Sequence, residues 1–556
     1  MGVRVAEVIG LLVCYVIILV IGVLASWWKN RRPAAEGEEE TGRTERIIVA
    51  RRDIGMIIGG FTMTATWVGG GYINGTAELV FSKGLLWTQA PIGYTLSLVL
   101  GGLIFAKPMR AKRYLTMIDP FQEKYGERIG GLMYLPAVVG ELFWSAAILS
   151  ALGASISVIM ELDFAVATII SAAFAIMYTV VGGLYSVTFT DMAQLIFIVF
   201  GLILSVPFAW YSPYVHLFNE AYIVNNTNFN LSNETEPYKP DWIGTIPTEQ
   251  IGTYIDSMLL LILGGIPWQC YFQRVLSTKT VKSAQQLSYL GALGCLLMAI
   301  PPTFIGIVAQ YADWDEAGYS NAKARGNAFM VLPLVLQYLT PPVVAFFGLS
   351  SISAAVMSSA DASILSASSM FANNIYRAIF RQKATDREMI WVIRVAIICT
   401  GCVACVLAII VESVAALWVF CSDLVYVILF PQLVCALFCP FSNRYGAVSG
   451  FAVGLVLRFI GGDTDLKIPV RVQYPFYDVE NKIQLFPFKT LASFCNLVTI
   501  LLVSLITDRI FVRRYRVSSV TALNDKDVGI ALQSKTTTGS KRFENGHDRV
   551  LAQQQF

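Results

Sequence analysis

The chain has 556 residues, of which 55% are hydrophobic and only 14% charged, and its mean hydropathy is +0.60. This balance excludes an ordinary soluble globular protein and indicates a polytopic membrane protein. The formal net charge of +3 is what the positive-inside rule produces, so it implies no nucleic-acid partner.

Apolar stretches of about 17 to 25 residues predict about thirteen membrane-spanning helices and an all-α fold. We place them at 6–27, 53–80, 85–106, 129–160, 163–182, 190–211, 250–272, 284–310, 341–376, 389–411, 415–438, 445–461 and 487–507. The first stretch lacks a basic leader region and a small-residue cleavage site, so we expect a retained helix and not a signal peptide.

These helices divide the chain into segments. We expect a first transmembrane helix at 1–27, a cytoplasmic loop at 28–52, a five-helix repeat at 53–211, an extracellular loop at 212–249, a second repeat at 250–438, additional transmembrane helices at 439–507 and a cytoplasmic tail at 508–556. The tail is rich in Ser, Thr, Lys and Gln and poor in large apolar residues, so it is predicted to be disordered and regulatory.

Basic residues gather in the loops after the first, third and ninth predicted helices and at the start of the tail. These segments share one side of the membrane, and positive charge marks the cytoplasmic side. We therefore expect an extracellular N-terminus and a cytoplasmic C-terminus. The loop after the sixth helix is then extracellular, and its three N-x-S/T sequons, at Asn225, Asn230 and Asn233, are predicted glycosylation sites.

Two of the predicted spans contain sequences that a continuous helix tolerates poorly. The second has Gly59 and Gly60, then Trp67 and three glycines at 69–71, and the seventh has GGIPW at 264–268. Each would be the first helix of a five-helix repeat, and the odd spacing gives the two repeats opposite orientations. Interrupted helices at matching places in inverted repeats indicate a transport site. The alternative is that the glycines only allow close helix packing.

The ninth predicted span contains SISAAVMSSADAS at 351–363. A carboxylate inside a membrane helix, here Asp361, is costly and by default indicates function. Hydroxyls and carbonyls one helical turn apart, together with carbonyls freed by the break in the second span, would offer the hard oxygen ligands that suit Na⁺. The candidate ligands are Thr64, Trp67, Ala355, Ser358 and Ser359. Tight packing of small residues is the alternative.

A set of aromatic residues lies within predicted spans and not at their charged ends: Trp67, Tyr94, Trp144, Trp268 and Trp418. A desolvated ring face attracts a cation by about 2 kcal/mol or more, and a cage of rings is the usual site for quaternary ammonium. Each ring alone is more readily explained as core. Their presence on both interrupted helices favours a cage.

Three other carboxylates, Glu141, Asp256 and Asp423, also lie in predicted spans. Glu141 precedes Trp144 by three residues and so shares its helical face. Each carboxylate either sets the potential of a cavity or pairs with another buried polar group.

The ten cysteines lie in or beside apolar spans, and the two histidines, His216 and His547, lie outside them. We therefore expect no disulfide framework, no metal site beyond sodium, no cofactor and no enzyme activity.

Residues 182–194, GGLYSVTFTDMAQ, resemble the signature of the sodium/solute symporter family, whose members share a leucine-transporter-like core of two inverted five-helix repeats. Other segments resemble the choline-transporting branch of that family: FTMTATWVGGGYINGTAE at 61–78, QAPIGY at 89–94, FAKPMR at 105–110, GGIPWQ at 264–269 and SAAVMSSAD at 353–361. The resemblance extends from about residue 5 to residue 507.

The resemblance implies a secondary active transporter that takes up choline across the plasma membrane, driven by Na⁺ and dependent on Cl⁻, and supplies acetylcholine synthesis at presynaptic terminals. It places the five rings around the choline ammonium, the Thr64 and Trp67 carbonyls with Ala355, Ser358 and Ser359 at one sodium site, and Asp361 near a second. It does not place the chloride. Synaptic-vesicle storage and trafficking adaptors on the tail are also implied, although 525–530, DKDVGI, is only suggestive of a sorting signal.

We expect alternating access, in which Na⁺ binds first and choline then completes the cage. One alternative is the same fold carrying betaine, proline or a sugar. Rings without an opposite charge argue against sugars, whereas betaine has the same ammonium. A second alternative is a membrane sensor that binds without transporting, and a third is an ion channel, which the lack of a repeated pore loop disfavours.

Overall fold

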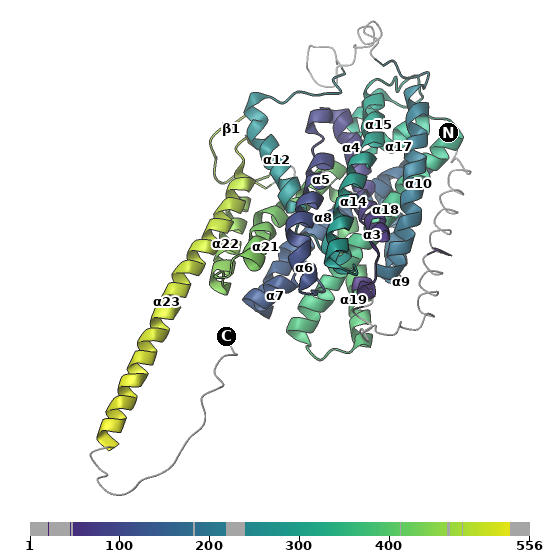
Figure 1. Cartoon of the computed structure of the whole chain (residues 1–556). Helices are drawn as coiled ribbons and strands as arrows, with labels where there is room; N and C mark the ends of the chain where they lie inside the picture. The colour runs from purple at the N-terminus through teal and green to yellow at the C-terminus, as the bar shows by residue number, and fades with distance from the viewer. Residues whose placement is uncertain are drawn as a thin grey trace.

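The computed structural model describes residues 20–21, 45, 48–181, 184–217, 240–411, 413–463, 468–480 and 482–533. In this part the chain forms a bundle of helices, with one long helix extending away from it (Figure 1). Most of the predicted first helix, most of the predicted cytoplasmic loop and the three sequons lie outside the described residues.

The first group of helices follows the predicted first repeat. It consists of η1 (Ala50–Arg52), α3 (Met56–Trp67), α4 (Gly70–Lys83), η2 (Leu85–Trp87), α5 (Ala90–Leu100), η3 (Gly101–Phe105), α6 (Ala106–Ala111), α7 (Asp119–Tyr125), α8 (Glu127–Met160), α9 (Phe164–Val181) and α10 (Leu184–Trp210).

The second group repeats the pattern, beginning again with an interrupted helix. It consists of η4 (Thr248–Gln250), α12 (Ile251–Gly264), α13 (Gln269–Leu276), α14 (Val281–Met298), α15 (Ile300–Gln310), α16 (Asn321–Gly326), η5 (Ala328–Met330), α17 (Val331–Tyr338), α18 (Pro342–Met370), η6 (Phe371–Phe380), α19 (Asp386–Ile410), α20 (Val414–Leu424), η7 (Val425–Leu429) and α21 (Phe430–Phe438).

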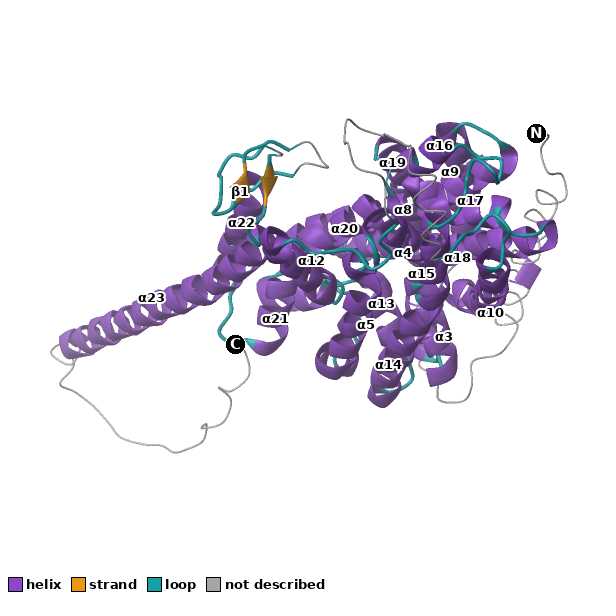
Figure 2. Cartoon of the chain, turned by 90° about the horizontal axis from the view of Figure 1, so that it is seen from above, coloured by secondary structure: helices purple, strands orange, loops and turns teal. Residues whose placement is uncertain are grey.

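The remaining elements are α22 (Arg444–Ile460), β1 (Tyr477–Asp478), β2 (Ile483–Gln484) and α23 (Phe488–Gln533). The two short strands pair antiparallel, with Tyr477 opposite Gln484. Seen from above, α22, α23 and the hairpin lie to one side of the main bundle (Figure 2).

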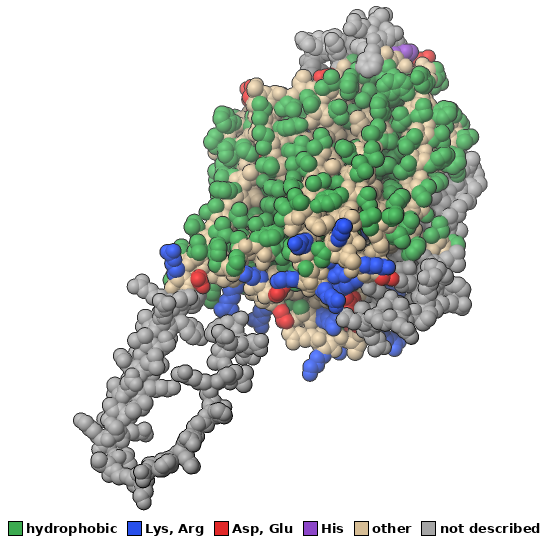
Figure 3. Space-filling model, in the orientation of Figure 1, with side chains coloured by type: hydrophobic (Ala, Val, Ile, Leu, Met, Phe, Trp, Pro, Cys, Tyr) green, Lys and Arg blue, Asp and Glu red, His purple; other side chains and the backbone are tan. Residues whose placement is uncertain are grey.

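Helix α8, helix α18 with η6, and helix α20 with η7 and α21 form the centre of the bundle, because they are the most deeply buried long apolar helices among the described residues. Peripheral helices instead expose apolar side chains, as α14 does at Leu293, Leu296 and Leu297. Such a surface suits contact with lipid, which makes this a multi-pass membrane protein. In Figure 3, apolar side chains cover a broad band of the visible face, and Lys and Arg gather along its lower edge.

Both predicted helix interruptions are present. Helix α3 ends at Trp67, Val68 and Gly69 leave the helical conformation, and α4 begins at Gly70. A Cβ atom at Gly69 would collide with Ser359 Oγ of α18. The glycines therefore also allow close helix packing, which is the alternative explanation drawn from the sequence. Packing and the helix break occur together here. In the second group, α12 ends at Gly264 and Trp268 is extended before α13 begins.

Within the described residues, nine helices are long and apolar enough to cross a membrane. The predicted spans missing from this set have specific causes. The span at 53–80 is divided at Val68 and Gly69. The span at 445–461 corresponds to α22, which has 17 residues, and the span at 163–182 contributes a shorter apolar helix at Phe164–Met177. Of the span at 6–27, only residues 20–21 are described. The count of thirteen stays a prediction.

The predicted tail differs from the structure over its first half. Helix α23 continues from the last apolar segment to Gln533, whereas disorder is expected from about residue 508. The segment 508–533 contains no proline, so nothing in its backbone chemistry forces the helix to end where the apolar residues do.

Candidate functional site

The five aromatic residues named from the sequence form one connected cluster, which we call the ring cluster. Trp67 lies at the end of α3, Tyr94 in α5, Trp144 in α8, Trp268 just before α13 and Trp418 in α20. Ring centroids are 5.7 Å apart for Trp67 and Tyr94, 5.2 Å for Trp67 and Trp144, 5.3 Å for Trp144 and Trp268, and 5.4 Å for Tyr94 and Trp418.

The ring cluster is buried, since each of its side chains is at most 4% exposed. Its rings come from helices of both repeats, and two of them stand at helix interruptions. The indole N–H groups of Trp67 and Trp144 have no hydrogen-bond partner among the described residues. Buried donors are normally paired. These two indole N–H groups are therefore available to a polar group of a bound molecule, while the ring faces suit a cation.

Trp268 Nε1 and Tyr94 Oη of the ring cluster do have hydrogen-bond partners, whereas Trp418 Nε1 has none among the described residues. Trp268 Nε1 donates to the Gly264 carbonyl across the break at 2.8 Å, which fixes its ring relative to the end of α12. Tyr94 Oη and Ser422 Oγ lie 2.9 Å apart, so α5 is tied to α20 one turn after Trp418.

The serines named as sodium ligands lie against the break in the first interrupted helix. Ser358 Oγ lies 3.2 Å from the Ala65 carbonyl oxygen, and Ser359 Oγ donates to the Thr66 carbonyl at 3.0 Å. The Ala355 carbonyl faces Gly69 from the same side of α18. The structure therefore brings Ala355, Ser358 and Ser359 to the break, as the sequence predicts.

The two serines themselves contact carbonyls that lie between Thr64 and Trp67. The Thr64 carbonyl accepts a hydrogen bond from the Val68 amide at 2.8 Å, and the serines contact the carbonyls of Ala65 and Thr66 instead. Helix α3 ends shortly after Thr64. The Thr64 carbonyl therefore still has an amide partner, whereas the carbonyls that follow it have none within the helix.

Asp361 faces a different neighbour. Its Oδ1 accepts from Thr179 Oγ1 of α9 at 2.6 Å, and its Oδ2 has no hydrogen-bond partner among the described residues. The side chain is 1% exposed. Asp361 is thus directed to α9, whereas Ser358 and Ser359 are directed to α3.

Sequence reasoning did not single out Asp191, which the structure places at the centre of a buried network. Asp191 of α10 accepts hydrogen bonds from Thr62 of α3 and from Ser358 of α18, the latter at 2.6 Å, and pairs with Arg274 of α13 at 3.4 Å. Asp191 and Arg274 are both essentially unexposed. The available signal was a carboxylate in an otherwise apolar segment, within the 182–194 motif itself.

The other carboxylates pair with polar neighbours. Asp423 pairs with Arg458 of α22, whose Nε donates at 2.6 Å, and lies 3.5 Å from Lys489 of α23. Asp256 accepts from the backbone and hydroxyl of Thr490. These contacts fix α22 and α23 to the bundle. Asp423 and Asp256 therefore each pair with another buried polar group, which is one of the two roles expected from the sequence.

Glu141 lies beside Trp144 and accepts from Ser363 Oγ of α18 at 2.6 Å. It is 1% exposed. It therefore pairs with a neutral hydroxyl next to the ring cluster, so the pairing alternative applies to it, and a role in setting a cavity potential stays a prediction.

A cavity of ≈ 410 Å³ reaches the ring cluster from one end of the bundle. We call it the α20 cavity. Its lining includes Glu78, Ser413, Ala415 and Trp418, together with Asp256 and Lys489. Trp87 also lines the cavity and donates its indole N–H to the Thr245 carbonyl at 3.0 Å, so the cavity lies beside the described part of the predicted extracellular loop.

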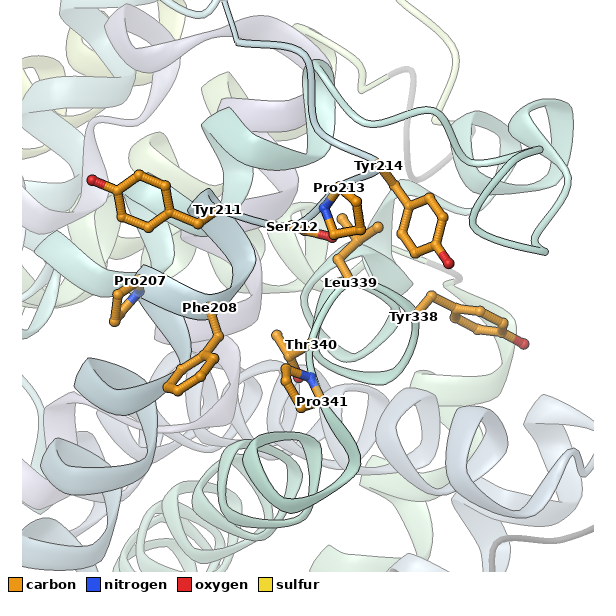
Figure 4. Close-up of a pocket in the computed structure, with 10 residues that line it drawn as sticks. All are labelled: Pro207, Phe208, Tyr211, Ser212, Pro213, Tyr214, Tyr338, Leu339, Thr340 and Pro341. Carbon is orange, nitrogen blue, oxygen red and sulfur yellow. The ribbon is translucent and has the colours of Figure 1, made fainter.

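A second cavity, of ≈ 450 Å³, lies elsewhere, between the end of α10 and the start of α18 (Figure 4). Its lining runs from Pro207 to Tyr214 and from Tyr338 to Pro341. It includes no residue of the ring cluster, so it takes no part in the site described above.

The chain is similar to known proteins over most of its length. The sodium:solute symporter family matches residues 47–454. "High affinity choline transporter 1" of Homo sapiens is 50% identical over 518 residues, covering 92% of this chain and 87% of that protein. "High-affinity choline transporter 1" of Drosophila melanogaster is 49% identical, covering 92% and 79%.

A more distant relative is the "Sodium/proline symporter" of Escherichia coli (strain K12), 25% identical over 66% of this chain and 72% of that protein. A solved structure of a Na⁺-coupled sialic acid symporter, in a substrate-bound outward-open state, superimposes with a TM-score of 0.68 at 16% identity. It covers 90% of this chain and 97% of that one. This likeness establishes a common fold.

Proposed function

Because this chain belongs to the sodium:solute symporter family, we propose that it is a sodium-coupled carrier that takes up choline. The observation that carries the substrate assignment is the buried cluster of five rings. A quaternary ammonium has no N–H to donate, so ring faces recognise it better than hydrogen-bond acceptors do. The named similarity to choline transporters supports the same substrate.

Sodium is proposed to bind where α18 meets the break after α3. The hydroxyls of Ser358 and Ser359 and the carbonyl of Ala355 face this break, and the carbonyls of Thr64 and Trp67 complete the proposed ligand set. Hard oxygen ligands suit this ion. Asp361 is proposed for a second sodium, reached from the Thr179 side of α18.

The coupling follows from the position of Trp67. Sodium would hold α18 against the last turn of α3, and thereby fix the ring of Trp67 for choline. The closed site would then open to the cytoplasm by alternating access. Each net positive charge carried inward gains about 2.3 kcal/mol per 100 mV of membrane potential, so voltage favours uptake.

The orientation is proposed from charge. Lys and Arg gather along one edge of the apolar band (Figure 3), where α6, α7 and the turn between η6 and α19 lie in Figure 1. Positive charge favours the cytoplasmic side. We therefore propose an extracellular N-terminus, a cytoplasmic C-terminus and glycosylation of the loop that carries Asn225, Asn230 and Asn233.

The remaining parts of the proposal are the chloride requirement, the plasma-membrane and presynaptic location, the supply of choline for acetylcholine synthesis, storage in synaptic vesicles and adaptor binding by the tail. Their support is the similarity to the named choline transporters.

The deciding experiment is uptake of radiolabelled choline into cells or vesicles that contain the protein, with Na⁺ or Cl⁻ replaced in turn. Uptake that disappears when Na⁺ is replaced by K⁺ is expected. Betaine and proline serve as unlabelled competitors, and stronger competition by either one than by choline would overturn the substrate assignment. Choline binding without accumulation would favour a sensor.

A further inference from the structure

Glu78, near the end of α4, is a buried carboxylate with no part in the proposed choline or sodium site. Its side chain is 7% exposed. Glu78 Oε1 accepts from Ser413 Oγ at 2.9 Å, and Oε2 accepts from the backbone N–H of Ala415 at 3.0 Å. Ser413 is the N-cap of α20 and itself accepts from the Ala416 amide at 3.1 Å. The carboxylate therefore binds the first turn of α20, where unpaired N–H groups and the helix dipole favour a negative charge.

The same face of α4 contacts Trp418 farther along. The rings of Tyr72 and Trp418 meet edge to face, with centroids 5.6 Å apart. A Cβ atom at Gly75 would lie 3.0 Å from Cε3 of Trp418. Residues three apart share a helix face, so Tyr72, Gly75 and Glu78 form one seam between α4 and α20. We call it the α4–α20 seam.

The α4–α20 seam lies between the α20 cavity and the ring cluster. Glu78, Ser413, Ala415 and Trp418 all line the cavity, whereas Trp418 is also a member of the cluster through its contact with Tyr94. Trp418 is 2% exposed. Its ring is thus the partition between cavity and cluster, and its position depends on where the first turn of α20 is held.

We propose that Glu78 is a positioning residue for transport: it acts as an outer latch that holds the first turn of α20, and with it Trp418, against α4. Release of Glu78 from Ser413 and Ala415 lets α20 move from α4 and connects the cavity with the ring cluster. The inference deepens the proposed function and rests on it, because a latch on this route matters only to a protein that carries its substrate through.

Cys421 offers a direct test, because it lies on α20 behind Trp418. It is buried, and its Sγ is 3.8 Å from Tyr94 Oη on the ring-cluster side. A membrane-impermeant thiol reagent is applied from outside, without choline, and labelling of Cys421 is timed with C421S as the background for other thiols. We expect E78A to accelerate labelling at least fivefold. E78Q should give a smaller increase, since its amide oxygen still accepts from Ala415 while the charge is lost.

S82A is the matched control. Ser82 lies on α4 and lines the same cavity, but its hydroxyl donates to the Glu78 carbonyl within α4 at 2.7 Å and does not reach α20. Labelling in S82A should equal that of the unaltered protein. S413A removes the partner on α20 and should accelerate labelling as E78A does, with the two changes together giving less than the product of their separate effects.

Uptake supplies a second measurement. E78A should lower the maximal rate of choline uptake several-fold and change the half-saturating choline concentration less than twofold. If Cys421 is labelled at the same rate in the unaltered protein and in E78A, both present at the cell surface, the latch is overturned. Acceleration that appears only when the reagent is applied from the cytoplasmic side would also overturn it. If E78A does not reach the surface, S413A carries the test, and unchanged labelling there overturns the proposal.

The labelling needs no substrate. Failure of the unaltered protein to accumulate choline would therefore refute the proposed function without altering the labelling result.

Discussion

Ser359 of α18 donates its hydroxyl to the carbonyl oxygen of Thr66 at 3.0 Å, and Thr66 directly precedes Trp67. The last carbonyls of a helix have no amide partner within it, so the break after Trp67 is what makes this carbonyl available. The contact places a hydroxyl proposed for sodium against the residue that directly precedes a ring proposed for choline. Ion binding and substrate binding can therefore be coupled by a small movement of one helix end.

Replacement of Ser359 by alanine is expected to shift sodium dependence. Loss of one such hydroxyl costs about 1 kcal/mol, or roughly a fivefold increase in the Na⁺ concentration for half-maximal uptake. The measurement is the sodium dependence of choline uptake. S368A is a control on the same helix, because its hydroxyl donates only to the Ile364 carbonyl of α18. An unchanged sodium curve in S359A would remove this residue from the ion site.

Removal of a ring from the ring cluster is expected to weaken choline uptake strongly. W67A or W268A should raise the half-saturating choline concentration about tenfold or more, since a desolvated ring contributes about 2 kcal/mol to binding a cation. W391A is the control, because Trp391 is 58% exposed on the outside of α19. Equal effects of the three changes on uptake, at equal surface amounts, would refute the cage.

Tyr94 allows the ring and its hydroxyl to be separated. Y94F keeps the ring and loses the contact with Ser422, so its loss of choline affinity should be no more than about 1 kcal/mol, or roughly fivefold. Y94A loses the ring as well and should be weaker still. If both variants lose the same affinity, the hydroxyl and not the ring recognises the substrate.

Removal of sodium is expected to lower the thermal stability of the purified protein. A ligand that binds only the folded state stabilises it by about 2.7 kcal/mol at a hundredfold excess over its dissociation constant. Tm should therefore fall when Na⁺ is replaced by K⁺, and choline should raise Tm less in K⁺ than in Na⁺. A choline effect that is equal in the two salts would contradict the proposed order, in which sodium binds first.

Asp191 is expected to be a major determinant of stability. It pairs with Arg274 in the interior and also accepts from Thr62 and Ser358. Loss of one partner of a buried ion pair costs about 3–5 kcal/mol because the other charge is left uncompensated. D191A should therefore lower Tm markedly, and E249Q, at an exposed position, should not.

The double variant D191A/R274M removes both charges and is expected to recover part of the lost stability. If D191A were as stable as the unaltered protein, the network would not have the structural role assigned to it. The sodium dependence of choline uptake should also change in D191A, because Ser358 loses its hydrogen bond to Asp191 and keeps only its contact with Ala65.

The sequence predicted the site through chemistry that is unusual within a membrane. Glycines and a proline in apolar helices, tryptophans away from the charged ends and a serine pair followed by a carboxylate each mark a local departure from a simple spanning helix. These signals identified both interruptions and all five rings. They did not single out Asp191 or Glu78, because each lies near the end of a predicted span, where a carboxylate needs no buried partner.

Sequence alone determined the class of the protein, the positions of the broken helices and the residue types available to a cation. Hydropathy and backbone chemistry are local properties, so the order of residues suffices for them. Only the tertiary structure decided that Trp67, Tyr94, Trp144, Trp268 and Trp418 meet in one buried cluster. It also decided that Ser359 meets Thr66, and that Asp423 meets Arg458 and not the ring cluster. Such pairings depend on how helices far apart in the chain pack, and that is set by side-chain contacts across the whole bundle.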